Sequence, residues 1–199
     1  MSSPSIRAIP EVLNQILLDN NIEACHLLGV SMGSLVAQAF ADRYPDRIKS
    51  VIIVGGYSIH KSNEQILKGQ KKEGLKWLLY ILFSMKKFRN YVTTVSCHTD
   101  SGHNLFARGV QHFSRRSFSA MAGMNSFFIK KETPMPYPLL IIVGVYDQQL
   151  ILEASVELHT LEEQSQRVVI PGAGHCANVD APSEFNHAVE NFLSNIRVT

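Results

Sequence analysis

The chain has few charged residues and few cysteines for its length. Charged residues make up 18% of its 199 residues, and the formal net charge is only +2. The densest basic groups, at 68–76 and 86–89, are expected to be solvated helix faces. Phosphate binding needs one continuous basic face, so we expect no nucleic-acid partner. Cys25, Cys97 and Cys176 lack the even number and regular spacing of a disulfide framework, which favours a reducing, cytoplasmic location.

Long apolar runs are also scarce. The longest, LKWLLYILFSM at 75–85, is far shorter than the roughly 20 residues that a membrane-spanning helix needs. The first residues, MSSPSIRAIPEVL, lack the basic start and the continuous apolar core of a secretion signal. Hydrophobic residues nevertheless account for 45% of the chain, enough for a substantial core. We therefore expect a globular cytoplasmic protein without a membrane span.

Strand-like and helix-like segments alternate at both ends of the chain. Periodic apolar residues predict helices, and short β-branched runs closed by glycine predict buried parallel strands. The expected strands are 24–30, 50–56, 139–144 and 167–172, and the expected helices are 9–18, 33–44, 151–163 and 182–196. This alternation predicts an α/β fold, with a mostly parallel sheet that carries helices on both faces.

The middle of the chain has a different pattern. Residues 57–133 hold helical stretches with aromatic and basic side chains and no obvious strand, and PMPYP at 134–138 ends this region. We therefore predict three parts. The first part of the core is 1–56, a helical cap is inserted at 57–133, and the second part of the core is 134–199.

Three polar residues follow three of the predicted strands. They are Ser31, Asp147 and His175. Because the carboxyl ends of parallel strands lie at one edge of a sheet, these side chains are expected to converge there. A serine hydroxyl is a weak nucleophile until a base removes its proton. The hypothesis is that Ser31 is the nucleophile, His175 the general base and acid, and Asp147 the group that orients the imidazole.

The sequence GVSMG at 29–33 predicts a tight strand-to-helix turn around Ser31. Gly29 and Gly33 would keep side chains out of this crowded turn. The helix that follows would present free N–H groups to a negatively charged oxygen, and the Met32 N–H is the expected oxyanion donor.

Other interpretations of these segments are weaker. Asp180 and Glu153 are poorer candidates for the acid, and Cys176 is expected to be a packing residue. GAGHCA at 172–177 formally matches a dinucleotide fingerprint, but the strand and acidic residue that the motif requires do not follow it. CHTDSGH at 97–103 offers Cys97, His98, Asp100 and His103 as metal ligands, yet no second pair has a familiar spacing. We expect no metal and no dinucleotide.

Three motifs in order resemble the α/β-hydrolase superfamily, in its cap-bearing branch with a serine nucleophile. GVSMG at 29–33 is similar to the nucleophile elbow G-x-S-x-G. VGVYD at 143–147 resembles the element that carries the acid, and IPGAGHCANVDAPSEFNHAVENFL at 170–193 resembles the segment that carries the histidine. The insertion at 57–133 falls where the family places its cap.

The resemblance implies a serine hydrolase without a metal or an organic cofactor. Its expected reaction is carboxylesterase-like cleavage of an ester or related acyl bond of a small molecule, a carbon–carbon bond being one alternative. The apolar residues of the insertion, among them Trp77 and Phe83, favour an apolar acyl or aromatic substrate. A cofactor-free haloperoxidase or a lyase would use the same three residues.

One part of the family pattern is not found. Members carry early strands and a His-Gly loop, which donates a second oxyanion N–H, before the first helix seen here. The expectation is therefore an N-terminally truncated fold that is weak or inactive alone, because losing one such donor costs about 10²–10³ in rate. The strand at 24–30 would then have an uncovered edge and could self-associate. The alternative is a non-catalytic remnant that acts as an interaction protein.

Overall fold

The computed structural model describes residues 6–60, 64–121, 123–131 and 133–196. Its centre is a four-stranded sheet in which every pair of neighbours is parallel. The strands are β1 (Cys25–Val30), β2 (Ile48–Val54), β3 (Leu139–Gly144) and β4 (Ser165–Ile170). They lie in the order β1-β2-β3-β4, so their order in space is their order along the chain.

The two central strands are apolar on both faces. Val51 and Ile53 of β2 lie beside Leu139 and Ile141 of β3 in register, and all four side chains are fully buried. A strand covered on both faces needs a continuous apolar run, and β-branched residues pack well on a pleated surface. The sequences of β2 and β3 meet both conditions.

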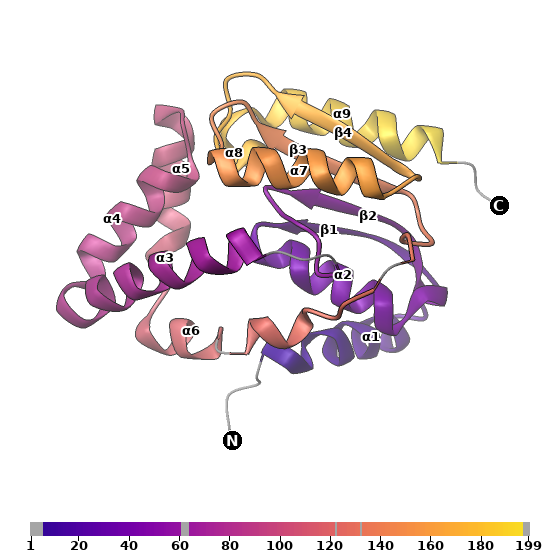
Figure 1. The fold of residues 1–199 in the computed structure, drawn as a ribbon, viewed down its shortest axis with the longest axis horizontal. Coiled ribbons are helices and arrows are strands. Elements are labelled where there is room, and N and C mark those ends of the chain that lie inside the picture. Colours follow the sequence, from indigo (N-terminus) through magenta and orange to yellow (C-terminus); the bar gives the residue numbers. More distant parts are fainter. Residues whose placement is uncertain (1–5, 61–63, 122, 132, 197–199) are drawn as a thin grey trace.

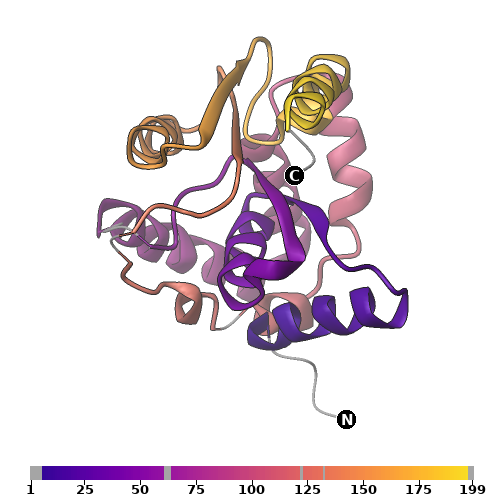
Figure 2. The same cartoon turned by 90° about the vertical axis from the view of Figure 1, so that its right-hand side faces the viewer.

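Helices cover the two faces of this sheet. On one face lie α2 (Met32–Arg43) and α7 (Gln149–Leu161), and on the other lie α9 (Pro182–Asn195) and the short α8 (Ala177–Asp180). Figure 2 shows the sheet edge-on between α7, in orange, and α9, in yellow. The helix α1 (Ile9–Asp19) packs against α2 and starts with Pro10 in its first turn, where a missing N–H has no cost.

Strand β1 is parallel as predicted but is not buried as predicted. His26 and Leu28 point to the face that α9 covers elsewhere, and Leu28 is 45% exposed. The reason is that α8 and α9 lie mainly over β3 and β4, and Val30 is the one described residue of β1 that packs against their cluster. The outer edge of β1 and the surface around His26 and Leu28 therefore have no cover among the described residues.

Between β2 and β3 the described residues form helices and no strand. These are α3 (Glu64–Phe83), α4 (Met85–Ser96), α5 (Asp100–Val110), α6 (Arg115–Ala120) and the 3₁₀ turn η3 (Met124–Phe127). Ser84, Thr99 and Ser114 each begin a helix by accepting a hydrogen bond from a backbone N–H of its first turn. Figure 1 places α3, α4 and α5 beyond the arrowheads of the strands, at the carboxyl end of the sheet.

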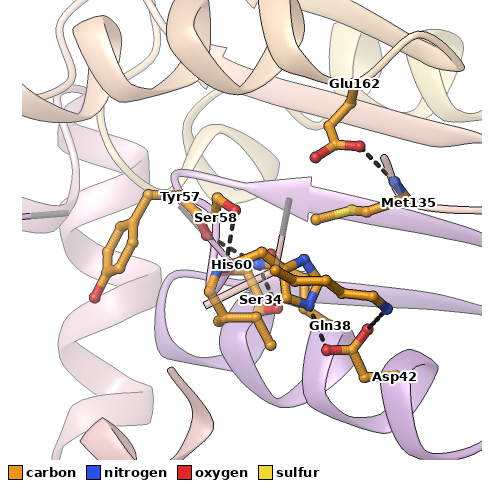
Figure 3. A network of polar contacts seen from close by, with 10 residues as sticks. Ser34, Gln38, Asp42, Tyr57, Ser58, His60, Met135 and Glu162 are labelled. Carbon is orange, nitrogen blue, oxygen red and sulfur yellow. Dashed lines mark hydrogen bonds and ion pairs between the residues drawn. The ribbon is translucent and has the colours of Figure 1, made fainter. Parts of the chain in front are cut away.

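Polar contacts attach the start of this inserted region to α2 (Figure 3). The Gln38 side chain donates to the Tyr57 carbonyl at 2.9 Å and accepts from the Ile59 N–H at 3.1 Å. His60 pairs through Nε2 with Asp42. Asp42 also accepts from Lys131 Nζ at 3.1 Å, and the Lys131 N–H donates to the His60 carbonyl. The start and the end of the inserted region are therefore both bonded to Asp42 of α2.

Several boundaries differ from the predicted ones. The second strand ends at Val54, two residues early, because Gly55 has a φ of +58° and turns the chain away. The fourth strand occupies 165–170 rather than 167–172, and the four residues of α8 were not predicted at all. No helix among the described residues combines the length and the apolar character that crossing a bilayer requires.

Candidate active site

Ser31 lies on a sharp turn between β1 and α2. Its φ of 52° and ψ of −117° are uncommon for a residue with a side chain, so the surrounding contacts must hold it there. The Ser31 N–H donates to the Val54 carbonyl at 2.7 Å, and the Ser31 carbonyl accepts from the Ser34 hydroxyl at 2.5 Å. The turn is thus fixed to the neighbouring strand and to the first turn of α2.

Gly29 is the glycine on which this turn depends. A Cβ atom at Gly29 would lie 2.3 Å from the carbonyl oxygen of Gly33, which no side-chain movement could relieve. The prediction that Gly33 must also lack a side chain is wrong, because a Cβ there would meet nothing within 4 Å. The crowding involves the Gly33 backbone and leaves the space beside its Cα open.

The structure brings the three predicted side chains together. His175 lies in the loop after β4, with Nε2 at 2.8 Å from Ser31 Oγ and Nδ1 at 2.9 Å from Asp147 Oδ1. The Asp147 side chain is completely buried, and that of His175 is 12% exposed. A carboxylate only accepts hydrogen bonds, so Nδ1 donates to it, and Nε2 of the neutral ring is left to accept from the Ser31 hydroxyl.

The loops that carry Asp147 and His175 hold each other. The Tyr146 N–H donates to the Ala173 carbonyl at 2.9 Å, next to both side chains in the sequence. A Cβ at Gly144 would lie 2.2 Å from the carbonyl oxygens of Ala173 and Gly174. The backbones can approach this closely only because residue 144 is glycine.

Electrostatics favour a positive charge on His175. Burial by itself lowers the pKa of this imidazole, but the Asp147 carboxylate accepts its hydrogen bond and attracts the proton. The net effect raises the pKa of His175 above its ordinary value. The ring can therefore take up a proton and remain stabilised while it holds it.

The start of α2 supplies a backbone donor beside Ser31. Met32 is the first residue of the helix, so no helical carbonyl accepts from its N–H. This N–H is therefore available to a negatively charged oxygen near Ser31.

Two of the weaker candidate residues have other roles. Glu153 accepts a hydrogen bond from Gln149 on the exposed surface of α7. Asp180 does not touch His175 but accepts hydrogen bonds from backbone N–H groups.

In the loop 97–103, His103 Nε2 bonds to the Cys97 carbonyl and His98 stacks on Tyr146. The described part of the chain contains no group of three His, Cys, Asp or Glu side chains placed to hold a metal ion.

Known proteins similar to this chain have the α/β-hydrolase fold. A family model described as the alpha/beta hydrolase fold matches residues 2–90. A protein of Bacillus subtilis assigned as a 2-succinyl-6-hydroxy-2,4-cyclohexadiene-1-carboxylate synthase is 24% identical over 94% of this chain and 71% of its own length. A 2-hydroxy-6-oxononadienedioate/2-hydroxy-6-oxononatrienedioate hydrolase of Cupriavidus pinatubonensis is 27% identical over 92% of this chain and 67% of its own. A thermophilic esterase from Thermogutta terrifontis superimposes with a TM-score of 0.77 at 19% identity, over 98% of this chain and 74% of that one.

The chain has the α/β-hydrolase fold. Its relatives include esterases and hydrolases of other bonds, and it spans about two thirds to three quarters of the length of the proteins compared above.

The sequence analysis missed one residue of this candidate site. Gly55 follows β2 with a φ of +58°, and a Cβ there would lie 2.8 Å from His175 Nδ1. Glycine is therefore required at this position for two reasons: the positive φ, and the lack of space for a side chain beside the imidazole. The pair Gly55-Gly56 directly after a β-branched run was the one indication of this in the sequence.

Proposed function

We propose that the chain is a serine hydrolase that cleaves an ester or a related acyl bond of a small molecule through an acyl-enzyme. One observation carries this proposal: the continuous hydrogen-bond chain Ser31–His175–Asp147, with distances of 2.8 and 2.9 Å. A hydroxyl, an imidazole and a carboxylate in this order can generate a nucleophile at neutral pH.

Each residue then has a defined step. His175 Nε2 takes the hydroxyl proton while Ser31 Oγ attacks the carbonyl carbon, and the Met32 N–H donates to the oxygen that becomes negative. His175 next gives its proton to the leaving group, which departs and leaves an acyl group on Ser31. Water, activated by the same imidazole, hydrolyses this ester. Asp147 keeps the ring in the required tautomer and stabilises its positive charge.

We propose an apolar acyl or aromatic small molecule as the substrate. Support comes from the inserted helices, where α3 exposes the apolar side chains of Leu78, Leu79, Leu82 and Phe83. The names of the relatives favour acyl-bond cleavage, since they include an esterase and a hydrolase of 2-hydroxy-6-oxo dicarboxylates. A panel of nitrophenyl esters from acetate to decanoate and benzoate, together with a ring-cleavage ketone, would define the bond and the acyl group.

A lyase reaction is the second candidate, because one relative is assigned as a synthase. The same base would then remove a proton from carbon, and no acyl group would form on Ser31. Trapping of an acyl-enzyme from a slow ester by mass spectrometry distinguishes the two reactions.

A fluorophosphonate probe tests the nucleophile directly. We expect the folded protein to be labelled on Ser31 and the variant Ser31→Ala to remain unlabelled. Ser119→Ala is the matched control, since Ser119 is an exposed serine of α6 outside the site. Absence of labelling in a protein with native circular dichroism would instead support a non-catalytic interaction protein.

We expect turnover by this chain alone to be slow. Met32 is the one oxyanion donor that we assign among the described residues, and a site without a second donor loses about 10²–10³ in rate. Compared with a typical kcat of about 10 s⁻¹, this predicts about 0.01–0.1 s⁻¹ on an activated ester. Active-site titration followed by steady-state kinetics measures this value, and a kcat near 10 s⁻¹ would contradict the expectation.

A further inference from the structure

Asp180 has no part in the proposed reaction, yet its carboxylate is one of the most highly bonded groups in the described structure. It ends α8, five residues after His175, and is 8% exposed. Oδ2 accepts from the N–H groups of His98 and Gly174, both at 2.8 Å. Oδ1 accepts from the N–H of Thr99 at 2.9 Å and from its hydroxyl at 2.8 Å.

These four donors belong to two different parts of the molecule. His98 and Thr99 form the connection between α4 and α5 in the inserted region, whereas Gly174 directly precedes His175. A fifth bond joins the same two segments on the other side of the imidazole, because the Cys176 N–H donates to the Ser96 carbonyl at 2.7 Å. Both neighbours of His175 in the chain are therefore tied to the end of α4 or to the α4–α5 connection.

The negative charge of the Asp180 carboxylate strengthens its hydrogen bonds to these donors. Burial alone would raise the pKa of Asp180, but the N–H groups of Thr99, Gly174 and His98 outweigh burial and lower it. Asp180 is therefore ionised at neutral pH, and hydrogen bonds to an ionised acceptor are stronger than those to a neutral one.

The surrounding backbone leaves no space for a different arrangement. A Cβ at Gly102, in the first turn of α5, would lie 2.0 Å from Asp180 Oδ1. A Cβ at Gly174 would lie 3.1 Å from the His98 nitrogen and 3.3 Å from Asp180 Oδ2. The carboxylate thus fits closely between two glycines, one in each of the two segments that it joins.

We propose that Asp180 is a positioning residue for His175, which binds the histidine loop and the α4–α5 connection to one carboxylate so that they move as a unit. This proposal rests on the proposed function, in which His175 is the base. It implies that any displacement of α4 and α5, including one caused by substrate, reaches the imidazole through Asp180.

Two variants disturb the carboxylate in different ways. Asp180→Asn keeps the shape, but its NH₂ group faces at least one backbone N–H in either orientation, so one or two of the four bonds are lost together with the charge. Gly102→Ala keeps the charge and displaces Oδ1, and alanine is a good helix former, so α5 itself is not weakened. Asp46→Asn, at an exposed carboxylate of η2 (Pro45–Arg47), is the matched control.

The first measurement is the pKa of the His175 ring by NMR titration, assigned with a His175→Gln variant. We expect it to lie above the ordinary value in the wild type and to fall in Asp180→Asn and Gly102→Ala, because the bond to Asp147 loosens. A fall in Asp180→Asn alone would be an effect of the lost charge and would overturn the proposal. This readout needs no catalysis, so a protein that is not labelled on Ser31 would refute the proposed function and leave this test intact.

The second measurement is the reaction of Cys97 and Cys176 with a thiol reagent in a Cys25→Ser background. Both thiols are buried at this junction, with 5% and 6% exposure. We expect both variants to react at least 10-fold faster than the wild type and Asp46→Asn to react at the wild-type rate. In the active enzyme, kcat should fall about 10–100-fold with little change in KM, since small misplacements of a reacting group have effects of this size. Unchanged thiol rates, or faster thiols with an unchanged His175 pKa, would overturn the proposal.

Discussion

Among single residues, Asp147 is the one whose environment depends most on whether His175 carries a proton. Its Oδ1 accepts from His175, while its Oδ2 is buried and has no hydrogen-bond partner in the part of the chain that the structure describes. A buried carboxylate with an unpartnered oxygen is costly unless a nearby positive charge compensates it. The imidazolium that forms during the reaction supplies that charge.

The raised pKa of His175 predicts the pH dependence of the reaction. A protonated imidazole cannot accept the Ser31 proton, so kcat/KM should fall as the pH decreases through this pKa. Because Asp147 raises the pKa, the midpoint of the acid limb should lie above the ordinary histidine value of 6.5. A pH–rate profile on an activated ester measures it, and a midpoint at or below 6.5 would contradict the assignment.

Replacement of the acid should change both the rate and that midpoint. Asp147→Asn keeps the shape but favours the tautomer with the proton on Nε2, which cannot accept from Ser31, and a loss of about 10⁴ in kcat is typical of such a change. The remaining activity should have its acid limb at lower pH. Glu153→Gln, on the exposed surface of α7, is the control and should leave both quantities unchanged.

Among the elements, the elbow between β1 and α2 contains two glycines that look equivalent in the sequence but differ in their structural requirement. Gly29→Ala would place a Cβ 2.3 Å from a backbone oxygen, whereas Gly33→Ala would meet nothing within 4 Å. We expect Gly29→Ala to lower the free energy of unfolding by more than about 2 kcal/mol, as backbone strain of this kind does. Gly33→Ala lies within α2 and should raise it by about 0.5–1 kcal/mol.

Urea titrations of the two alanine variants and the wild type measure this difference. Equal midpoints for Gly29→Ala and Gly33→Ala would show that the elbow relaxes around a side chain. Fluorophosphonate labelling of the same samples reports whether Ser31 keeps its orientation in each variant.

Elements with a strong apolar pattern were predictable, and those defined by contacts between distant segments were not. The strand predicted at 139–144 matches β3 residue for residue, since a β-branched run between Pro138 and Gly144 has clear limits. The convergence of Ser31, Asp147 and His175 followed from their places after strands. The role of Asp180 and the need for glycine at 55 arise from backbones that meet only in the folded chain.

For the whole molecule, the exposed edge of β1 predicts association. The strand has no neighbour on its outer side among the described residues and contains no charged residue or proline that would discourage pairing. The β1 strands of two copies can pair antiparallel about a two-fold axis. The two sheets then form one continuous sheet, and Leu28 of each copy lies at the junction. The occupant that we expect for this edge is therefore a second copy of the chain.

Light scattering at several concentrations tests this expectation. The wild type should form dimers at micromolar concentration, and Leu28→Lys should be largely monomeric because the pairing would bury a charge. Val156→Lys changes a similarly exposed apolar residue on α7 and should associate like the wild type. A monomeric wild type at every concentration would contradict the prediction.

The agreement between strand order and chain order bears on how the protein is made. A nascent chain that leaves the ribosome can add each new strand beside one already in place, from β1 to β4, although one face of β2 and β3 is covered only when α8 and α9 have been made. The elbow and the acid loop are complete well before residue 175 is synthesised. During translation the proposed proton acceptor is therefore added after all four strands, when the rest of the candidate site has already been made.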